Sequence, residues 1–287
     1  MRLAAVERLA RDPTCLLTPD ERDQGARLKH VSRHREWLAG RVVAKWLFLR
    51  HVDRVAHPAH GTAWPPTAYG VGPEALDALP GGEYRRIEIL RAAGGAPRLS
   101  WSAAPHVEAG ARVSIAHRGG WVMAAISSGG AIGVDIEAVE PRRPSFHDAC
   151  LTASERRWLG RAAAADVSPL ATLLWTLKEA CLKTGASRAH SVWDIDAIDC
   201  RISTPPDVVA RSWRRREAHL FPVALDVALA VDTARLLAAH GVVGPVVFTV
   251  VALVPHARAA ARRTGPEHAR ISHRVAISSH AWQEDLS

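Results

Sequence analysis

The sequence predicts an α+β protein built from two similar α/β lobes that are related by a pseudo-twofold duplication. The chain has 287 residues, about twice the length of an ordinary domain, and helix and strand patterns alternate along most of it. The motif Leu-Thr-x-x-Glu-Arg occurs at 17–22 and again at 151–156. Each copy precedes a helical pattern in which Trp and Lys are eight residues apart, namely Trp37 and Lys45, then Trp175 and Lys183. The alternative is that such short motifs recur by chance.

The composition favours a folded globular protein with polyanionic partners. Hydrophobic residues make up 48% of the chain and charged residues 23%, which argues against a disordered chain, a collagen or a coiled coil. The 37 Lys and Arg residues exceed the 29 Asp and Glu residues, so the formal charge is +8. This balance favours nucleic acid, acidic proteins or phosphorylated small molecules as partners, although a high-GC coding bias towards Arg and Ala would produce it too.

Neither a cysteine zinc site nor a membrane anchor is expected. The four cysteines are widely spaced and form no Cys-x-x-Cys pair, so a cytoplasmic location fits better than a disulfide framework. The segment 1–12 is charged and lacks the apolar centre of a secretory signal. The longest apolar run, 241–255, is shorter than the roughly 20 residues that span a bilayer.

Helix signals open the first lobe. Thr18 and Glu21 form a capping box with Pro19 in the first helical position, so a helix is expected to begin near residue 19. Apolar residues at helical spacing predict a second helix over 33–51. The Pro- and Gly-rich stretch 57–82 is expected to be an irregular crossing segment.

Strand patterns follow these helices. One strand is expected over 84–90, and three more are expected over 113–116, 120–126 and 131–137. The glycine pair at 119–120 and the Ser-Ser-Gly-Gly stretch at 127–130 are expected to connect the last three strands as hairpins.

The second lobe begins with helices again. Thr152 and Glu155 form a second capping box, so a helix is expected to begin there, and a stripe of leucines predicts a longer helix over 168–184. Strands are expected over 195–202 and 223–231. Beyond them, arginines scattered among alanines predict a loosely ordered extension. The expected regions are an N-terminal lobe over 1–130, a C-terminal lobe over 131–233 and a basic extension of unknown role over 234–287.

Acidic residues are placed so that they could converge on a metal ion. Asp135 and Glu137 are two apart on an expected strand, so their carboxylates share one face. Glu179 lies four residues from Trp175 and four from Lys183 on one face of an expected helix. If these faces meet, three carboxylates repel one another unless a cation is bound, and oxygen ligands favour Mg²⁺ or Mn²⁺. Taken singly, the first pair is an ordinary solvated strand edge, and Glu179 with Lys183 is an ordinary surface ion pair.

Together, these motifs resemble a known family. Gly-Val-Asp-Ile-Glu at 133–137, followed by Trp-x-x-Lys-Glu-Ala-x-x-Lys at 175–183, is similar to the signature of the 4′-phosphopantetheinyl transferases, most of all the two-lobed Sfp-type class. Ser-Ile-Ala-His at 114–117 resembles that family's Ser-x-Ser-His segment, and Gly-Ala-Pro at 95–97 resembles its Gly-x-Pro element. Residues 33–41 look like the basic helix of its N-terminal lobe.

The resemblance implies the 4′-phosphopantetheinyl transferase fold and a holo-carrier-protein synthase. Such an enzyme moves the phosphopantetheine arm from coenzyme A to a serine of an acyl or peptidyl carrier protein and releases adenosine 3′,5′-bisphosphate. It implies Mg²⁺ dependence, with Asp135, Glu137 and Glu179 as metal ligands. Glu179 would also be the general base, and Lys183 would stabilise or protonate the leaving phosphate.

The same resemblance assigns coenzyme A binding to basic side chains. His117 would contact the 3′-phosphate, Arg33 and Arg41 would hold the nucleotide phosphates, and Lys178 would assist them together with Lys183. Arg41 is taken to match the position of Glu179 in the other lobe. Coenzyme A would lie between the two related halves, so a monomer would be sufficient.

Two departures from the family pattern support a competing reading. Ala116 stands where the second serine is expected, and Arg118 follows His117. The alternative is therefore a relative that binds coenzyme A but modifies nothing. A basic nucleic-acid-binding protein is a third reading, but the sequence has no helix-turn-helix, zinc-finger or RNP-type pattern. Neither nucleic acid nor a membrane is expected as a partner.

Overall fold

The computed structural model describes a mixed α/β protein with two compact units. The described residues are 15–56, 67–70, 81–92, 95–102, 111–127, 130–185, 192–214, 221–223, 225–226, 234–255 and 275–281. Of these, the first unit contains the segments up to residue 127 together with 275–281, and the second unit contains the segments from 130 to 255.

The helices of the first unit begin where capping chemistry places them. The capping box of Thr18 and Glu21 opens α2 (Pro19–Ala26), as expected. Helix α3 (Val31–Ala56) extends the expected second helix at both ends. A short α5 (Gly81–Tyr84) precedes β2 (Ile87–Arg91), so the strand that was expected to start at 84 begins three residues later.

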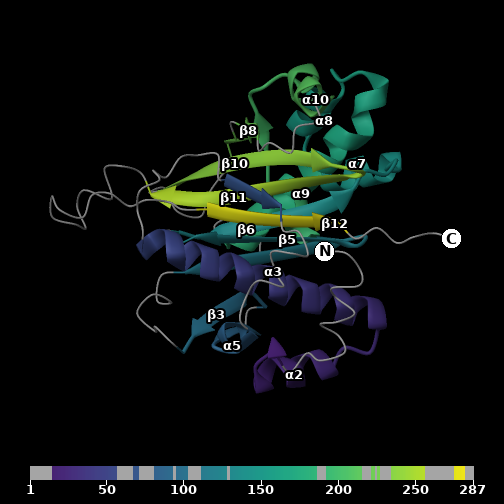
Figure 1. Ribbon diagram of the computed structural model, residues 1–287. Coiled ribbons are helices and arrows are strands. Elements are labelled where there is room, and N and C mark those ends of the chain that lie inside the picture. The colour runs from purple at the N-terminus through teal and green to yellow at the C-terminus, as the bar shows by residue number, and fades with distance from the viewer. Residues whose placement is uncertain are drawn as a thin grey trace, which may run out of the picture. The chain divides into compact units, whose positions relative to one another are not determined.

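The first unit contains a four-stranded sheet and a two-stranded ribbon. The sheet order is β1-β12-β5-β4, and β2 pairs with β3 (Pro97–Trp101) in the ribbon. The sheet strands are β1 (Thr67–Gly70), β4 (Arg112–Arg118), β5 (Trp121–Ser127) and β12 (Val275–Ala281). Helix α3 packs along one face of this sheet (Figure 1), where Leu38 and Phe48 share a core with Ile126.

The second unit contains another four-stranded sheet, with the order β6-β11-β10-β8, in which β10 and β11 are 10 residues long. Its strands are β6 (Ile132–Ala138), β8 (Phe221–Val223), β10 (Ala234–Val243) and β11 (Val246–Pro255). A small ribbon pairs β7 (Arg201–Ile202) with β9 (Leu225–Asp226).

Helix α9 (Val167–Thr184) packs against β6 and β11 of this sheet (Figure 1). The second capping box, at Thr152, opens α8 as expected. The other helical elements are α7 (Pro144–Cys150), α8 (Ala153–Leu159), α10 (Pro206–Arg214) and the 3-10 helices η2 (Ala164–Asp166) and η3 (Val192–Ala197).

Gly133 allows α9 to approach β6 closely. A Cβ atom at this position would lie 1.9 Å from the carbonyl oxygen of Ala180 and 3.2 Å from Cβ of Lys183. The helix therefore rests on a strand position that has no side chain, two residues before Asp135. This contact fixes how α9 presents its side chains to the strand.

The strands β5 and β6 belong to different sheets, which corrects the expected hairpin at 127–130. The turn between β4 and β5 does form at Gly119 and Gly120, whose φ values of 54° and 78° suit glycine. In contrast, β6 pairs with β11. The chain leaves one unit and enters the other between β5 and β6, so local turn chemistry alone gives the wrong partner.

The prediction of a loosely ordered C-terminal extension over 234–287 is also wrong, because the described residues of this range form strands. Strands β10 and β11 pair with each other along their lengths, and β11 lies beside β6. Strand β12 lies between β1 and β5 in the sheet of the first unit. The apolar run at 241–255 comprises the end of β10, the turn at 244–245 and the central strand β11, whose Val247 and Val250 are fully buried, a pattern typical of strands covered on both faces. The arginine-rich residues 256–274 lie outside the described residues.

Three smaller expectations are corrected or reach beyond the described residues. The expected strand over 195–202 is η3 followed by β7, because only 201–202 find a partner strand. Of the expected strand over 223–231, the described residues are 223 and 225–226. The stretch 57–82 contains β1, and its remainder up to residue 80 lies outside the described residues. Among the described residues, no helix is both long enough and apolar enough to cross a membrane.

A conservative change at Gly133 tests the close contact between β6 and α9. Gly133→Ala is expected to lower the free energy of unfolding by about 1–3 kcal/mol, because the new methyl group must displace helix backbone. Gly82→Ala is the matched control, since a Cβ atom there meets nothing within 4 Å. Urea denaturation of both variants measures the effect, and equal stabilities would contradict the packing described here.

His240 links β10 to α10 in the interior of the second unit. Trp213 donates its indole Nε1–H to His240 Nδ1 at 2.9 Å, and the His240 side chain is almost fully buried. Burial lowers the pKa of His240 from 6.5 to about 4. The folded protein therefore keeps this imidazole neutral at pH values where the unfolded chain protonates it.

This pKa shift predicts a loss of stability in acid. Between pH 6.5 and about 4 the unfolded state binds a proton that the folded state refuses, so the free energy of unfolding falls by about 1.4 kcal/mol per pH unit. His240→Asn keeps an acceptor for Trp213 and removes the titration, so its stability should fall less between pH 7 and 4.5 than that of the wild type. His30→Asn, at an exposed position, should behave like the wild type. Parallel losses in all three proteins would refute the assignment.

Candidate active site

Strand β6 and helix α9 bring two of the expected site residues into direct contact. Lys183 Nζ donates to Asp135 Oδ1 at 2.6 Å and to the carbonyl oxygen of Val134 at 3.1 Å. Asp135 is buried, whereas the Lys183 side chain is about one-third exposed (32%). The expectation that this helix face turns towards the strand is therefore met for Lys183.

The three expected carboxylates influence one another electrostatically. Burial raises the pKa of Asp135 to about 6, with Lys183 opposing the rise and the charge of Glu179 adding to it. Burial also raises the pKa of Glu179, again opposed by Lys183 and increased by Glu137. The charge of Glu179 thus makes the ionisation of Asp135 harder, and the charge of Glu137 does the same to Glu179, as expected for neighbouring negative charges.

The donor atoms at this site suit a hard cation, but they do not converge. Asp135 Oδ2 is buried and receives no hydrogen bond within the described part of the chain, so an oxygen ligand is available. However, no three His, Cys, Asp or Glu side chains among the described residues are grouped so that they could hold a metal ion. Lys183 neutralises Asp135 in this arrangement, and Arg142 Nη2 lies 3.7 Å from Glu137 Oε2.

Arg142 is a residue of this region that the sequence motifs do not identify. Its guanidinium lies 4.9 Å from the ring centre of Phe146, and Phe146 packs against Trp175 with ring centroids 5.2 Å apart. Trp175 is on α9, one turn before Glu179. An aromatic contact between α7 and α9 thus holds a cation beside Glu137.

A separate cavity lies within the first unit and contains three more of the expected residues. We call it the α2 pocket; its volume is about 520 Å³. Arg33, Arg41 and His117 all line it, although they come from two elements. Further lining residues that the sequence motifs missed include Gln24, Arg27, Glu36 and Arg91, and the Gly-Ala-Pro element contributes Gly95 and Pro97.

Arg41 is held firmly in the wall of the α2 pocket. Its guanidinium stacks over the Trp37 ring at 4.4 Å and donates from Nη2 to Gln24 Oε1 at 2.9 Å. Burial lowers the pKa of Arg41 to about 10, so it remains a cation at neutral pH. His117 Nδ1 lies 3.1 Å from Glu36 Oε2. The pocket therefore presents one firmly held cation, Arg41, together with exposed arginines and a carboxylate beside the histidine.

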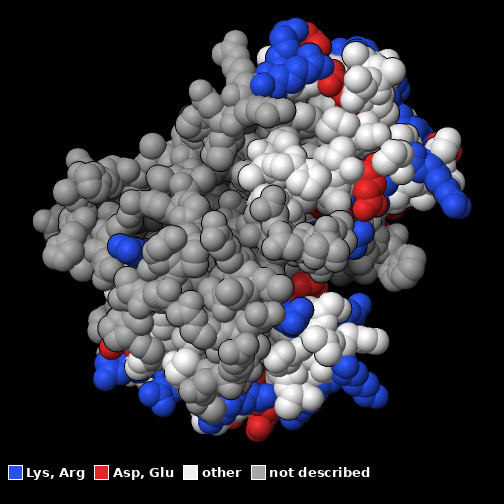
Figure 2. All heavy atoms as spheres, turned by 45° about the vertical axis from the view of Figure 1, so that its right-hand side comes forward, with Lys and Arg blue, Asp and Glu red and all other residues white. Residues whose placement is uncertain are grey.

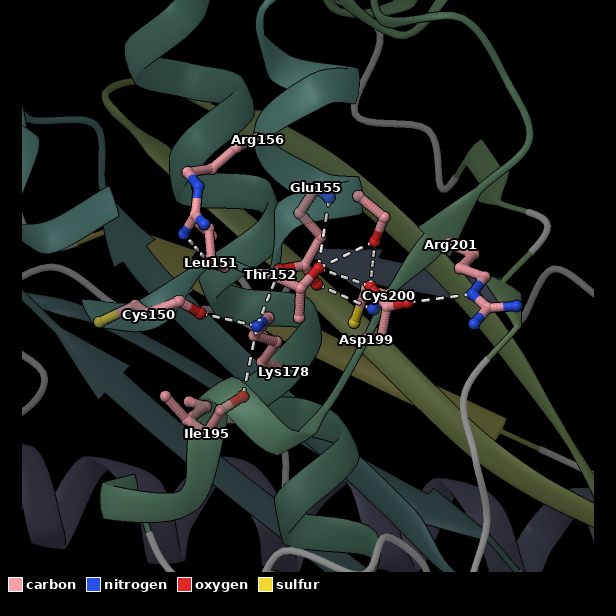
Figure 3. A network of polar contacts seen from close by, with 11 residues as sticks. Cys150, Leu151, Thr152, Glu155, Arg156, Lys178, Ile195, Asp199, Cys200 and Arg201 are labelled. Carbon is pink, nitrogen blue, oxygen red and sulfur yellow. Dashed lines mark hydrogen bonds and ion pairs between the residues drawn. The ribbon is translucent and has the colours of Figure 1, made fainter. Parts of the chain in front are cut away.

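Lys178 does not lie at either site, which corrects its expected role in coenzyme A binding. Its ammonium is fully buried, 2.8 Å from Glu155 Oε2, and donates to the carbonyl oxygens of Cys150 and Ile195 (Figure 3). Burial raises the pKa of Glu155, and the charge of Lys178 opposes that rise. Every donor of this ammonium has an acceptor inside the protein, so none is left for a phosphate.

The first unit contains the same arrangement around Lys45. Its ammonium is fully buried, pairs with Glu21 Oε2 at 2.5 Å, and donates to the carbonyl oxygens of Leu16 and Tyr84. Glu21 also accepts from the main-chain N–H of Ile89.

The matching atoms in the second unit correct the register of the internal repeat. Glu155 likewise accepts from the N–H of Cys200. Lys45 therefore corresponds to Lys178 and not to Lys183, and the helices align five residues away from the register suggested by the Trp and Lys spacing. In this register Glu179 corresponds to Trp46 rather than Arg41.

The comparisons with known proteins concern the second unit. Residues 131–224 match the model of the 4′-phosphopantetheinyl transferase superfamily. This part of the second unit is therefore similar to that superfamily. The matched segment includes β6 and α9 and hence both parts of the carboxylate motif, Gly-Val-Asp-Ile-Glu and Trp-x-x-Lys-Glu-Ala-x-x-Lys. The comparison with curated proteins found no match to the chain.

The buried ion pair predicts a strongly asymmetric mutational response. Lys178→Met should lower the free energy of unfolding by about 3–5 kcal/mol, because it leaves the Glu155 carboxylate buried without a counter-charge. The double variant Lys178→Met/Glu155→Gln should regain part of that loss. Arg211→Ala breaks an exposed pair with Asp207 in the same unit and should have little effect. Thermal and urea unfolding measure all three. A double variant less stable than Lys178→Met would contradict the argument.

Proposed function

We propose that this protein transfers the 4′-phosphopantetheine group of coenzyme A to a serine of an acyl or peptidyl carrier protein and releases adenosine 3′,5′-bisphosphate. The superfamily domain at 131–224 supports a transferase of phosphopantetheine. The observation that carries the proposal is the 2.6 Å contact between Lys183 and Asp135. It joins the two halves of the motif, which are far apart in the sequence, at one place on β6 and α9.

A divalent cation, Mg²⁺ or Mn²⁺, is part of the proposal. Asp135, Glu137 and Glu179 would hold it, and Asp135 Oδ2 has the free acceptor capacity that a metal ligand needs. When bound, the ion would neutralise charge on the pyrophosphate of coenzyme A. The electrostatic coupling among the three carboxylates supports this assignment, because a cation would relieve it.

In the proposed reaction, one residue of this chain accepts a proton and another provides a positive charge. The serine oxygen of the carrier forms a bond to the β-phosphorus of coenzyme A, and the bond from that phosphorus to the oxygen of the bisphosphate leaving group breaks. Glu179 takes the serine proton, directly or through water; its raised pKa makes it a better base than an ordinary glutamate. Lys183 is the cation that stabilises the leaving phosphate.

We assign the nucleotide phosphates of coenzyme A to the α2 pocket. Arg33, Arg41 and His117 were each assigned a phosphate contact through the family resemblance, and all three line this single cavity. Arg41 Nε is buried and makes no hydrogen bond with a described residue, so an anion would complete its bonding. Arginine side chains suit phosphates because two parallel N–H groups contact two oxygens.

We also infer that the two units arose by duplication, as the Sfp-type class would require. The support is the repeated set of contacts in which a capping-box glutamate, a buried lysine and two main-chain carbonyls recur with the same partners. Thr18 donates to Glu88 just as Thr152 donates to Asp199. Such agreement among separate segments is far more demanding than a match of short motifs.

The charge of the protein supports an acidic partner. The formal charge is +8. On the face drawn in Figure 2, the blue Lys and Arg side chains of the described residues predominate over the red Asp and Glu side chains. Carrier proteins commonly present acidic surfaces, and complementary charge raises the rate of encounter. We propose that the enzyme acts as a monomer in the cytoplasm.

A coenzyme A-binding protein without transferase activity is the second candidate. One observation favours it: the described carboxylates are met by Lys183 and Arg142 and do not converge into a metal site. It predicts that coenzyme A binds while no carrier is modified.

Intact mass of a carrier protein tests both candidates. Incubation with this protein, coenzyme A and Mg²⁺ should add the phosphopantetheine group to a fatty-acid, polyketide or peptide carrier, and EDTA should prevent it. Glu179→Gln should lower turnover at least about a hundredfold through loss of the general base. Glu140→Gln, at an exposed position just after β6, should leave turnover unchanged. Bound coenzyme A with no mass gain on any carrier would favour the second candidate.

A further inference from the structure

A second cavity, in the second unit, is assigned no role by the proposed reaction. We call it the α8 pocket; it has a volume of about 540 Å³, close to that of the α2 pocket. Its lining residues are Ser154, Arg157, Trp158, Arg161, Cys200, Arg201 and Ile202. Three of these are arginines and none is acidic. We propose that the α8 pocket is a second anion site, which binds a phosphate-bearing small molecule.

Two of the three arginines of the α8 pocket are exposed at its helix, and the third is paired with a carboxylate. The side chains of Arg157 and Arg161 are exposed, near the end of α8 and just after it. Arg201 is also largely exposed, and its Nε donates to Asp199 Oδ2 at 3.0 Å. Guanidinium groups on two sides of one cavity suit a phosphate, because each can offer two parallel N–H donors.

Asp199, a carboxylate that contacts two lining residues of this pocket, is already engaged. Asp199 accepts from the hydroxyl groups of Thr152 and Ser154 as well as from Arg201 (Figure 3). Burial alone would raise the pKa of Asp199, but these hydrogen bonds lower it. Asp199 therefore stays ionised and holds Arg201 at the pocket, while Arg157 and Arg161 supply the excess positive charge.

The repeated buried network relates part of one pocket to part of the other. Gln24 and Arg27 follow Glu21 by three and six residues, and Trp158 and Arg161 follow Glu155 by the same steps. The first pair lines the α2 pocket and the second lines the α8 pocket.

The correspondence continues on the neighbouring strand. Arg91 lies two residues after Ile89, whose N–H contacts Glu21, and Ile202 lies two residues after Cys200, whose N–H contacts Glu155. Arg91 lines the α2 pocket and Ile202 the α8 pocket. Arg27 and Arg161 are thus arginines at equivalent positions of the two pockets. The other arginines of the α8 pocket, Arg157 and Arg201, have no arginine at the equivalent position of the first unit.

The form of the cavity favours a small ligand over a protein surface. Trp158 is almost fully buried, and its indole Nε1–H donates to the carbonyl oxygen of Thr204 at 2.9 Å. With Ile202 it gives the pocket an apolar wall beneath charged side chains. A concave site of a few hundred Å³ with an apolar wall and a few convergent polar groups is typical for small molecules.

Only the choice of ligand rests on the proposed function, through the nucleotide phosphates assigned to the α2 pocket. Adenosine 3′,5′-bisphosphate is therefore the probe, and titration calorimetry on the full chain is the measurement. The wild type should bind two molecules. Arg157→Ala/Arg161→Ala should bind one, with the affinity of the lost site weakened at least about tenfold for each arginine. Arg27→Ala/Arg33→Ala, the matched pair in the α2 pocket, should retain the α8 site.

The controls separate phosphate recognition from other effects. Arg211→Ala removes an exposed arginine of the same unit that does not line the pocket, and it should still bind two molecules. Adenosine, which has no phosphate, should not bind at the α8 site. Melting temperatures of the variants should match that of the wild type, because the replaced side chains are exposed.

Several results would overturn the proposal. They are a single site in the wild type that persists in Arg157→Ala/Arg161→Ala, two sites in Arg157→Ala/Arg161→Ala, or equal binding of adenosine. An unchanged stoichiometry with a raised KM for the carrier would also overturn it, because that would make this a protein-docking surface. The carrier mass assay keeps the two proposals apart: transfer should persist in Arg157→Ala/Arg161→Ala, and two sites without any transfer would refute only the proposed function.

Discussion

Each unit of this protein depends on one buried ion pair. Moving Glu155 and Lys178 out of water is costly, and a pair of this kind is tolerated only when its remaining hydrogen bonds are made. Here the lysine contacts two main-chain carbonyls and the glutamate contacts two main-chain N–H groups. The pair thereby ties α8, α9 and the segments around Cys150 and Ile195 into one cluster. Glu21 and Lys45 do the same for the first unit.

The buried ion pair distinguishes the lysine and acidic residues that stabilise the fold from those that lie at the candidate active site. Lys178 and Glu179 are adjacent on α9, yet Lys178 is fully buried in the core, whereas Glu179 is partly buried and is influenced by the charge of Glu137 on β6. With α9 fixed by Lys178 on one side and by the contact at Gly133 on the other, Lys183 meets Asp135. The geometry of the candidate active site is thus a consequence of structural contacts around it.

The two cavities show how a repeated frame can carry different chemistry. Helices α2 and α8 and the strands beside them contribute to the α2 pocket and the α8 pocket, and each pocket is rich in arginine, but α3 lines the first pocket while α9 does not line the second. In contrast, the carboxylates Asp135, Glu137 and Glu179 all belong to the second unit. In the first unit, Trp46 stands at the position that corresponds to Glu179. The carboxylate motif thus belongs to the second unit, whereas each unit has an arginine-lined pocket.

Local patterns in the sequence determined both capping boxes, the extents of α3 and α9 to within a few residues, and the motif residues that lie in the segment similar to the superfamily. Only the tertiary structure decided which strands pair with one another. It placed β6 beside β11 instead of β5, and it placed β12 in the sheet of the first unit. It also buried Lys178 and exposed Lys183. Helix caps and turns depend on neighbouring residues, whereas strand pairing and the burial of a charge depend on segments distant in the chain, which a single sequence does not bring together.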